Sequence, residues 1–552
     1  MQHCPHNIID SVKNRLFKVT PDPISPVNYH KNAVKYARRI RDSIQLTAER
    51  SESFFNVRDE YRPEPVPNIV TINALLHRIV TRLADRVVEK YKPFDRDNFF
   101  FNKKGSLRNR YLKARDEILK YGFNIDKDSD IQAFVKLERY FDESKSPRMI
   151  LGRNPRFNIF YAQFIEPIEK AFFELDEVAN GKDHHAVGEQ FSKLASRCSH
   201  FVENDMSKYE SSQRREVLYL EYLFYYLVLS KVCPDAVPLL RLAYAACLHN
   251  KVKTSVGVTF KFMLCRVSGD LTTSLGNGVI NLITSTFNQV LNSCDPQRCG
   301  LDLCNNPGCR VKDIIVKGDD SVLGANRCHK FVNYYKWFGL DAKIIPRANA
   351  ESVEFCSGGF VEVSPGNWVY VQKLQKLIES LTTCLNEDAV ENGYVAQYYY
   401  SLGVMYKIVY RGIPVYEDIA DFLLKTNRTE TTRLNTNLIQ SFNLVSAFKA
   451  DHSVSHVIDK SMAYLGVSLA NSMDYAELER IQTWCRNNAL VFPEEMRKRK
   501  RERIAKAKKD DLTLNWDLLN ANVLSSDLSE RVKSEAVSLQ ELETMYHNIN
   551  SP

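Results

Sequence analysis

Ten residues in the middle of the chain, Val316 to Ala325 (VKGDDSVLGA), place two adjacent carboxylates between apolar runs. The β-branched and aliphatic residues around Gly318, Asp319 and Asp320 predict a β-hairpin with the two acids at its turn. Carboxylates this close repel each other and resist ionisation unless a cation neutralises them. Oxygen ligands favour Mg²⁺ or Mn²⁺, so the hairpin predicts a divalent metal site. Taken alone, Gly318-Asp319-Asp320 is more typical of a solvated turn. Whether it is a metal site therefore depends on the other segments of the chain.

The composition is that of a large globular protein without a membrane span. The 552 residues, 44% of them apolar and 26% charged, can bury a large core divided into several subdomains. The most apolar run, 217–230, is too short to cross a bilayer and contains Glu221. The N-terminus lacks the apolar core of a secretory signal, so the thirteen cysteines are expected as free thiols in a reducing compartment.

The excess of positive charge is concentrated near the C-terminus. The formal net charge is +8, and Arg497 to Lys509 holds nine basic residues and one acid. The rest of the chain is therefore close to neutral and would bind nucleic acid through local basic surfaces. A nuclear-import signal, an anionic-membrane patch and a solvated charged helix are the alternatives to RNA binding by this run. The candidate RNA contacts in it are Arg497, Lys498, Arg499, Lys500 and Arg501.

Two basic segments precede the hairpin. Residues 103–120 predict a basic helix that binds RNA or is simply solvated, and residues 131–170 present several guanidiniums, which suit a triphosphate. Scattered surface arginines would give the second pattern equally well. The candidate RNA contacts are Lys103, Lys104, Arg108 and Arg110, and the candidate triphosphate contacts are Lys136, Arg148 and Arg153.

A third acid comes before the hairpin in the sequence FVENDMSKYESSQ, residues 201–213. Asp205 follows the start of a short apolar strand, and Glu210 lies five residues further on. An acid at a strand end opposite the Asp319 turn would complete a metal site. The alternative is that Asp205 caps the helix predicted after it.

Small polar residues open a predicted helix in SGDLTTSLGNGVIN, residues 268–281. Ser268 and Gly269 predict a turn, and a helix is expected from about Thr273. Thr273 and Asn277 are four residues apart and would share one helix face. That face offers a hydroxyl and an amide to a ribose, although small polar residues are also ordinary at a helix N-terminus.

Four cysteines recur at a spacing of five residues between this helix and the hairpin. Glycine and proline between them permit the tight turns of a tetrahedral thiolate site, but four intervening residues are at the loose end of zinc patterns. Structural zinc and free thiols in an inserted loop are both compatible with the spacing. The residues are Cys294, Cys299, Cys304 and Cys309.

In this order, the segments resemble a viral RNA-dependent RNA polymerase of the plus-strand, tombusvirus-like and alphavirus-like groups. The resemblance covers roughly residues 100–370. Asp205-x4-Glu210 resembles motif A, the Ser268 to Asn277 pattern motif B, and Gly318-Asp319-Asp320 motif C. These families usually have Asp where Glu210 stands. The resemblance also implies a motif D lysine at Lys343, a motif E at Phe355-Cys356-Ser357, and a fingers motif through Lys136, Glu138, Arg148 and Arg153.

The resemblance implies an α+β fold, a right hand of fingers, palm and thumb whose antiparallel palm sheet is backed by helices. The expected parts are a helical N-terminal extension packed on the fingers or thumb (1–95), fingers (96–200), palm (201–370), helical thumb (371–490) and a basic C-terminal tail (491–552). The palm is expected to contain a finger insertion at about 215–262 and the Cys-rich insertion at 292–312.

The resemblance also implies roles for these residues. Asp205 and Asp319, assisted by Asp320, would hold two Mg²⁺ or Mn²⁺ ions, and Lys343 would give a proton to pyrophosphate. Ser268, Gly269, Thr273 and Asn277, with Glu210, would bind the nucleotide and test its ribose.

The partners implied are an RNA template and product, ribonucleoside triphosphates, and other replicase or host membrane factors. The location implied is the cytoplasm of an infected cell, at membrane-associated replication complexes. A reverse transcriptase and a catalytically dead RNA-binding replicase scaffold are the alternatives.

Overall fold

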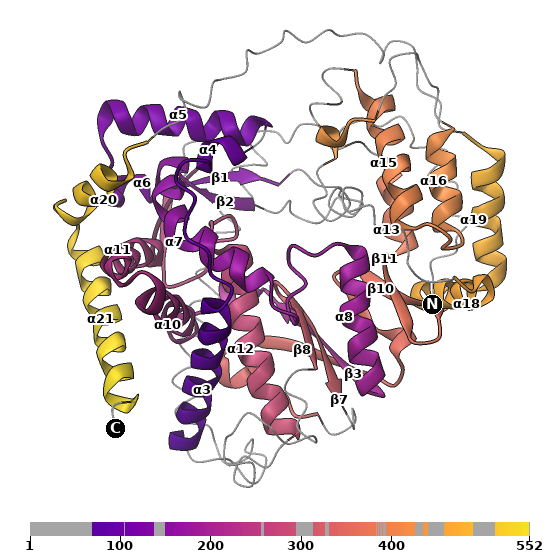
Figure 1. The fold of residues 1–552 in the computed structure, drawn as a ribbon, viewed down its shortest axis with the longest axis horizontal. Coiled ribbons are helices and arrows are strands. Elements are labelled where there is room, and N and C mark those ends of the chain that lie inside the picture. The colour runs from indigo at the N-terminus through magenta and orange to yellow at the C-terminus, as the bar shows by residue number, and fades with distance from the viewer. Residues whose placement is uncertain are drawn as a thin grey trace.

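The computed structural model of the chain (Figure 1) describes 69–103, 105–136, 149–254, 259–293, 313–325, 331–381, 384, 386, 389, 393–425, 434–439, 458–489 and 514–550. Several predicted site residues lie outside these ranges: Lys104, Arg148, Cys294, Cys299, Cys304, Cys309, Arg497, Lys498, Arg499, Lys500 and Arg501. No helix among the described residues is long and apolar enough to cross a membrane.

A four-stranded antiparallel sheet lies at the centre of the fold. Its order is β6 (Ile314–Lys317), β7 (Asp320–Ala325), β3 (His200–Ser207) and β8 (Asp341–Arg347). Neighbouring residues of one strand point to opposite faces, and these faces are covered by different helices. Ile314 and Val316 share a buried cluster with α12 (Thr273–Ser293), whereas Ile315 shares another with α8 (His184–Arg197).

A second four-stranded sheet joins segments that are about a hundred residues apart in the chain. Its order is β2 (Met149–Arg153), β1 (Ile131–Val135), β4 (His249–Thr254) and β5 (Thr259–Met263), and β1 runs parallel to β4. The helices α10 (Arg215–Val232) and α11 (Val237–Leu248) lead into β4. The segment 215–262 thus leaves the central sheet and returns strands to the sheet of residues 131–153. A single bridge between Gly152 and Gly269 links this second sheet to the start of the α12 segment.

A three-stranded sheet and the helices that follow it, within residues 354–487, share a second buried core. The sheet comprises β9 (Glu354–Phe355), β10 (Gly358–Ser364) and β11 (Asn367–Gln372). The helices are α13 (Leu374–Leu381), α15 (Val395–Val409), α16 (Tyr416–Leu424), α18 (Lys460–Asn471) and α19 (Tyr475–Asn487). These helices form the orange group on the right of Figure 1. The helical structure expected over 371–490 is present in the described part of that range.

Helices from the N-terminal third surround the first core. They are α3 (Ile69–Val88), α4 (Phe99–Asn102), α5 (Gly105–Tyr121), α6 (Ile125–Asp128) and α7 (Pro155–Phe173). Residues of α3, α5 and α7 contribute to the same buried cluster as α10, α11 and α12. The helix predicted over 103–120 is therefore confirmed for the described residues, and the described part of the N-terminal extension is helical in α3.

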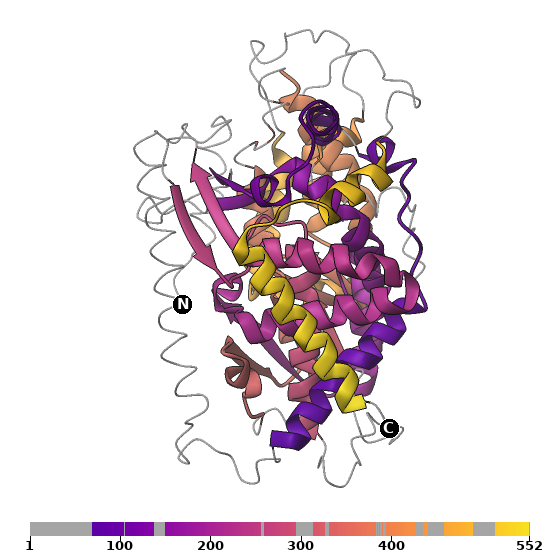
Figure 2. The same cartoon turned by 90° about the vertical axis from the view of Figure 1, so that its left-hand side faces the viewer.

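The end of the chain corrects the prediction of a basic tail over 491–552. Within this stretch, α20 (Trp516–Leu524) and α21 (Glu530–Asn550) are packed helices that carry more acidic than basic residues. Arg241 on α11 makes a two-point ion pair with Glu543 on α21, at 2.9 and 2.7 Å. Figure 2 shows α21 lying across α10 and α11. The packing of α21 could not be predicted from its sequence, because two of its buried residues, Glu535 and Glu543, are acids.

Candidate active site

Two of the predicted metal-binding acids face each other across neighbouring strands. Asp205 on β3 is in register with Asp320 on β7, and on its other side with Lys343 on β8. Lys317 and Asp320 close a two-residue turn made of Gly318 and Asp319. Gly318 has φ of 62°, a left-handed conformation that glycine adopts without steric cost. The predicted hairpin with the acids at its turn is confirmed, as is the position of Asp205 opposite it.

The electrostatics of the three neighbouring acids, Asp205, Asp319 and Asp320, favour a bound cation. Like charges directly opposite each other destabilise a sheet. Burial, together with Asp320, Glu210 and Asp205, raises the pKa of Asp319 to about 6. Burial and Asp205 also raise the pKa of Asp320, against the opposing effect of hydrogen bonds from Cys356 in the turn between β9 and β10.

The three acids lie at one end of the inner strands β3 and β7, but they do not form a ready-made metal site. Within the described ranges, no three His, Cys, Asp or Glu side chains are close enough to hold an ion as they stand. Neighbouring carboxylates at this end of the strands nevertheless fit hard divalent cations, which bind through a few carboxylates plus water and substrate phosphates. Asp205, Asp319 and Asp320 are therefore the residues that would hold such ions.

Asn281 on α12 holds the Gly318–Asp319 turn in place by hydrogen bonds to its backbone. This role was not predicted from the sequence. Asn281 Nδ2 donates to the backbone oxygens of Gly318 and Asp320, at 3.0 and 3.1 Å. Its Oδ1 accepts from the hydroxyl of Ser285 at 2.9 Å, and the side chain is fully buried. The signal available in the sequence was its place one helical turn after Asn277.

For the polymerase activity that the resemblance implies, Asn281→Asp should lower the rate of nucleotide addition about a hundredfold with little change in nucleotide KM. An aspartate has the same shape but offers oxygens to two carbonyls that need a donor, so the turn should shift, and small misplacements cost about 10²-fold. Steady-state kinetics of the variant beside Asn292→Asp, further along the same helix, measure the effect. A rate equal to that of the parent would contradict a positioning role for Asn281.

The predicted ribose-sensing pair is brought together. Lys208, which has a left-handed φ of 50°, lies between the end of β3 and the short helix α9 (Tyr209–Ser212) that carries Glu210. Asn277 Nδ2 donates to Glu210 Oε1 at 3.3 Å. The longer glutamate side chain therefore still reaches the motif B asparagine.

The remaining motif B residues mainly contact backbone. The hydroxyl of Thr273 donates to the carbonyl of Val267 at 2.6 Å, and that of Ser268 to the carbonyl of Met149 at 3.5 Å. A side chain at Gly269 would meet the Leu151 carbonyl oxygen at 2.6 Å. This loop is thus held against β2, and glycine is required at the point of closest approach. The helix predicted from about Thr273 begins at that residue.

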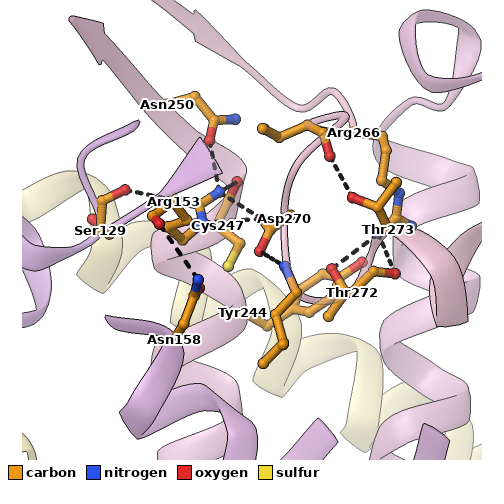
Figure 3. A network of polar contacts seen from close by, with 12 residues as sticks. Ser129, Arg153, Asn158, Tyr244, Cys247, Asn250, Arg266, Asp270, Thr272 and Thr273 are labelled. Atoms are coloured by element: carbon orange, nitrogen blue, oxygen red, sulfur yellow. Dashed lines mark hydrogen bonds and ion pairs between the residues drawn. The ribbon is translucent and has the colours of Figure 1, made fainter. Parts of the chain in front are cut away.

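Arg153, which we expected to contact the triphosphate, lies in the interior of the protein instead. Its guanidinium makes an ion pair with Asp270 at 2.7 Å and donates to the carbonyl of Ser129 and to Asn250 Oδ1, at 2.7 and 2.9 Å. Figure 3 shows these partners converging on it from separate elements. Its side chain is fully buried. This corrects the expectation for Arg153, because protein acceptors surround the group and solvent does not reach it.

Two of the basic residues expected to meet RNA have partners inside the protein. Lys103 pairs with Glu166 and lies 4.5 Å from the centre of the Phe99 ring. Arg108 donates through Nε to the carbonyl of Lys103 at 2.7 Å. Arg110 is exposed on α5, and Lys136 follows directly after β1. RNA contact therefore stays a prediction for Arg110, and triphosphate contact for Lys136.

If Lys343 has the general-acid role that the resemblance implies, Lys343→Arg should slow nucleotide addition by about 10²-fold or more, the usual contribution of a general acid. Lys343 is exposed and in register with Asp205, so its side chain begins next to the acids of the site. Arginine keeps the charge but does not release a proton. Single-turnover rates of this variant and of Lys336→Arg, a lysine before β8, measure the effect. An unchanged rate would leave Lys343 as an ordinary strand lysine.

Comparison with known proteins identifies the family. The family model described as viral RNA dependent RNA polymerase matches residues 47–490. The RNA-directed RNA polymerase of Groundnut rosette virus (strain MC1) is 25% identical over 357 residues, 61% of this chain and 40% of that protein. That of Turnip crinkle virus is 26% identical over 352 residues, 59% of this chain and 41% of the relative.

A third relative, the RNA-directed RNA polymerase of Tobacco necrosis virus (strain D), is 24% identical over 432 residues, 71% of this chain and 55% of the relative. The chain thus spans roughly half the length of these curated relatives. The family match includes Asp205, the acidic hairpin, the Glu210–Asn277 pair and Lys343 within one span. On this match and this geometry, the chain belongs to the viral RNA-dependent RNA polymerase family.

Proposed function

We propose that this chain is an RNA-directed RNA polymerase that copies the RNA of a plus-strand virus. The observation that carries the proposal is the register of Asp205 with Asp320 at the two-residue acidic turn, within a chain of this family. The central sheet would be the palm. The second sheet with its helices would be the fingers, and the helices from α13 to α19 the thumb.

Each part of the site has a task in this reaction. Asp205, Asp319 and Asp320 would bind two divalent ions, Mg²⁺ or Mn²⁺. Bound there, such ions supply Lewis-acid stabilisation to the attacking 3′-oxygen and to the leaving pyrophosphate. Lys343 would donate a proton to the pyrophosphate, and Glu210 with Asn277 would meet the ribose of the incoming nucleotide. The 2′-hydroxyl is the group by which such a site separates RNA from DNA precursors.

A template-directed synthesis assay tests the proposal. Purified protein is incubated with a defined RNA template and primer, Mg²⁺, and either ribonucleotides or deoxyribonucleotides. Extension with ribonucleotides alone supports the proposal. Extension with deoxyribonucleotides would instead indicate a reverse transcriptase, and RNA binding without any extension would indicate a scaffold. The presence of Asp205 beside Asp319 and Asp320 argues against the inactive scaffold. The pattern that ends in Asn277 argues against the reverse transcriptase.

We propose RNA template, RNA product and ribonucleoside triphosphates as partners because the family acts on them. Replicase and host membrane factors as partners, and a cytoplasmic location at replication complexes, stay predictions. Fractionation of infected cells with an antibody to this chain would test the location.

A further inference from the structure

Behind the Glu210–Asn277 pair, a line of buried side chains continues into the protein. Gln213 Nε2 donates to Asn277 Oδ1 at 2.8 Å. Arg266 Nε in turn donates to Gln213 Oε1 at 2.8 Å, and the Arg266 guanidinium makes an ion pair with Glu221. Gln213 and Glu221 have no exposed surface, and Asn277 and Arg266 are at most 6% exposed.

The chemistry of these groups allows the line to run in one direction only. Arginine is a donor and never an acceptor, so it must meet the oxygen of the Gln213 amide. The amide nitrogen of Gln213 then faces Asn277, and only the Asn277 oxygen can accept from it. The Asn277 nitrogen is thereby turned toward Glu210, whose carboxylate accepts from it at 3.3 Å. Arg266 thus determines, through Gln213, which atom of Asn277 faces the nucleotide site.

The start of the line is itself firmly held. Glu221 accepts from the hydroxyls of Tyr225 and Tyr244, at 2.6 and 2.8 Å. Arg266 also donates to the hydroxyl oxygen of Thr272 at 3.1 Å, beside the motif B loop drawn in Figure 3. Buried ion pairs persist when their remaining hydrogen-bonding groups are satisfied in this way.

The neighbouring helix leaves room for this ion pair by a missing side chain. A Cβ at Gly276 would clash with Glu221 Oε1 and would lie 2.5 Å from Arg266 Nη2. Gly276 directly precedes Asn277, so the helix residue that senses the nucleotide and the residue that admits the ion pair are adjacent. The position of α12 and the orientation of the Asn277 amide are therefore set by the same buried pair.

We propose that Gln213 and Arg266 are positioning residues for ribose recognition, fixing the amide of Asn277 so that ribonucleotides are preferred over 2′-deoxyribonucleotides. The inference rests on the proposed function. An oriented N–H beside a carboxylate offers the 2′-hydroxyl both a donor and an acceptor. A nucleotide without that hydroxyl leaves these partners unpaired, which is how polar sites reject an analogue that lacks a group.

Gln213→Glu is the sharpest test, because it keeps the shape and removes the donor. A carboxylate cannot donate to Asn277 Oδ1, so the Asn277 amide is expected to turn over and present its oxygen to Glu210. Discrimination, measured as kcat/KM for ATP over kcat/KM for dATP on one primer-template, should fall about tenfold, the upper contribution of an ordinary hydrogen bond. Gln213→Met, which introduces no charge, should lower the same ratio and serves if the glutamate variant does not fold.

Gln163→Met is the matched control. Gln163 is similarly buried on α7 and exchanges hydrogen bonds with Asn520, at 2.8 and 2.9 Å. Its loss should change thermal stability without changing the ATP to dATP ratio. A ratio unchanged in both Gln213 variants would overturn the inference, and so would an equal fall in the Gln163 variant.

The inference and the proposed function fail separately. If the parent protein adds no nucleotide to any primer-template, the polymerase proposal fails. The ratio of ATP to dATP affinities, measured by calorimetry on parent and variants, then still tests the positioning role. Equal affinity ratios in parent and Gln213 variants would overturn it in that case. We leave Arg266 unaltered because removing one partner of a buried ion pair destabilises the whole fold.

Discussion

Asp319→Asn should reduce nucleotide addition by at least about 10³-fold while leaving the protein as stable as the parent. Charge stabilisation by bound metal ions is normally worth several kcal/mol, and about 4 kcal/mol corresponds to three orders of magnitude in rate. Asp319 stands at the tip of the turn beside Asp320, and Asp205 is in register with Asp320. An amide oxygen at this position brings no negative charge to the ion, so it binds a hard cation more weakly than a carboxylate does.

The stability of the Asp319→Asn protein depends on the direction in which folding shifts the pKa of Asp319. The pKa of Asp319 rises from 3.8 to about 6 on folding, because of burial and the neighbouring acids. The folded protein therefore binds the proton more tightly than the unfolded chain, and stability contributed by this group is lost as pH rises from about 4 through 6. The amide of the Asp319→Asn variant would carry no charge in that range. The metal-free variant should thus melt at or above the temperature of the parent near neutral pH, and Mg²⁺ should raise its melting temperature less.

Asp341→Asn is the matched control, since Asp341 is an exposed acid on β8 two residues from Lys343. It should retain both the parent's rate and the parent's response to Mg²⁺. An Asp319→Asn protein that adds nucleotides within about tenfold of the parent would remove Asp319 from the metal site. A large drop in its melting temperature would show that the carboxylate has a structural partner instead.

Local sequence chemistry was sufficient for the hairpin and the motif B helix. A glycine followed by two acids between apolar runs defines a short turn, and small polar residues before an apolar periodic run define a helix start. Both are decided by residues within a few positions of each other. The opposition of Asp205 to Asp320 needed one more step, the resemblance that placed both strands in one sheet.

The parts that sequence reasoning missed depend on partners far away in the chain. Arg153 can be buried because it pairs with Asp270, which lies 117 residues further along the chain. No residue near Arg153 in the sequence indicates this partner. Helix α21 docks through Glu543, which looks like a solvent residue until Arg241 is placed opposite it. In each case a charged side chain lies on the buried face of its element, where its charge alone would suggest solvent, because its partner comes from another element.

Breaking the Arg153–Asp270 pair should have the largest effect on stability. Arg153→Met should lower the free energy of unfolding by about 3–5 kcal/mol, because Asp270 would remain buried without its partner. Asp270 has only 5% of its side chain exposed and follows directly after the Ser268–Gly269 turn, so this loop should loosen from β2. Urea or thermal unfolding measures the stability, and nucleotide KM is measured on the same protein.

A double-mutant cycle separates this structural role from triphosphate binding. Arg153→Met combined with Asp270→Leu should cost less than the sum of the two single changes, because no buried charge is left unpaired. Arg110→Met, on an exposed arginine of α5, should change stability by less than about 0.5 kcal/mol. If Arg153 instead served the triphosphate, its loss would raise the nucleotide KM while leaving the unfolding free energy almost unchanged. The fully buried guanidinium, with Asp270, Asn250 and the Ser129 carbonyl around it, leads us to expect the loss of stability.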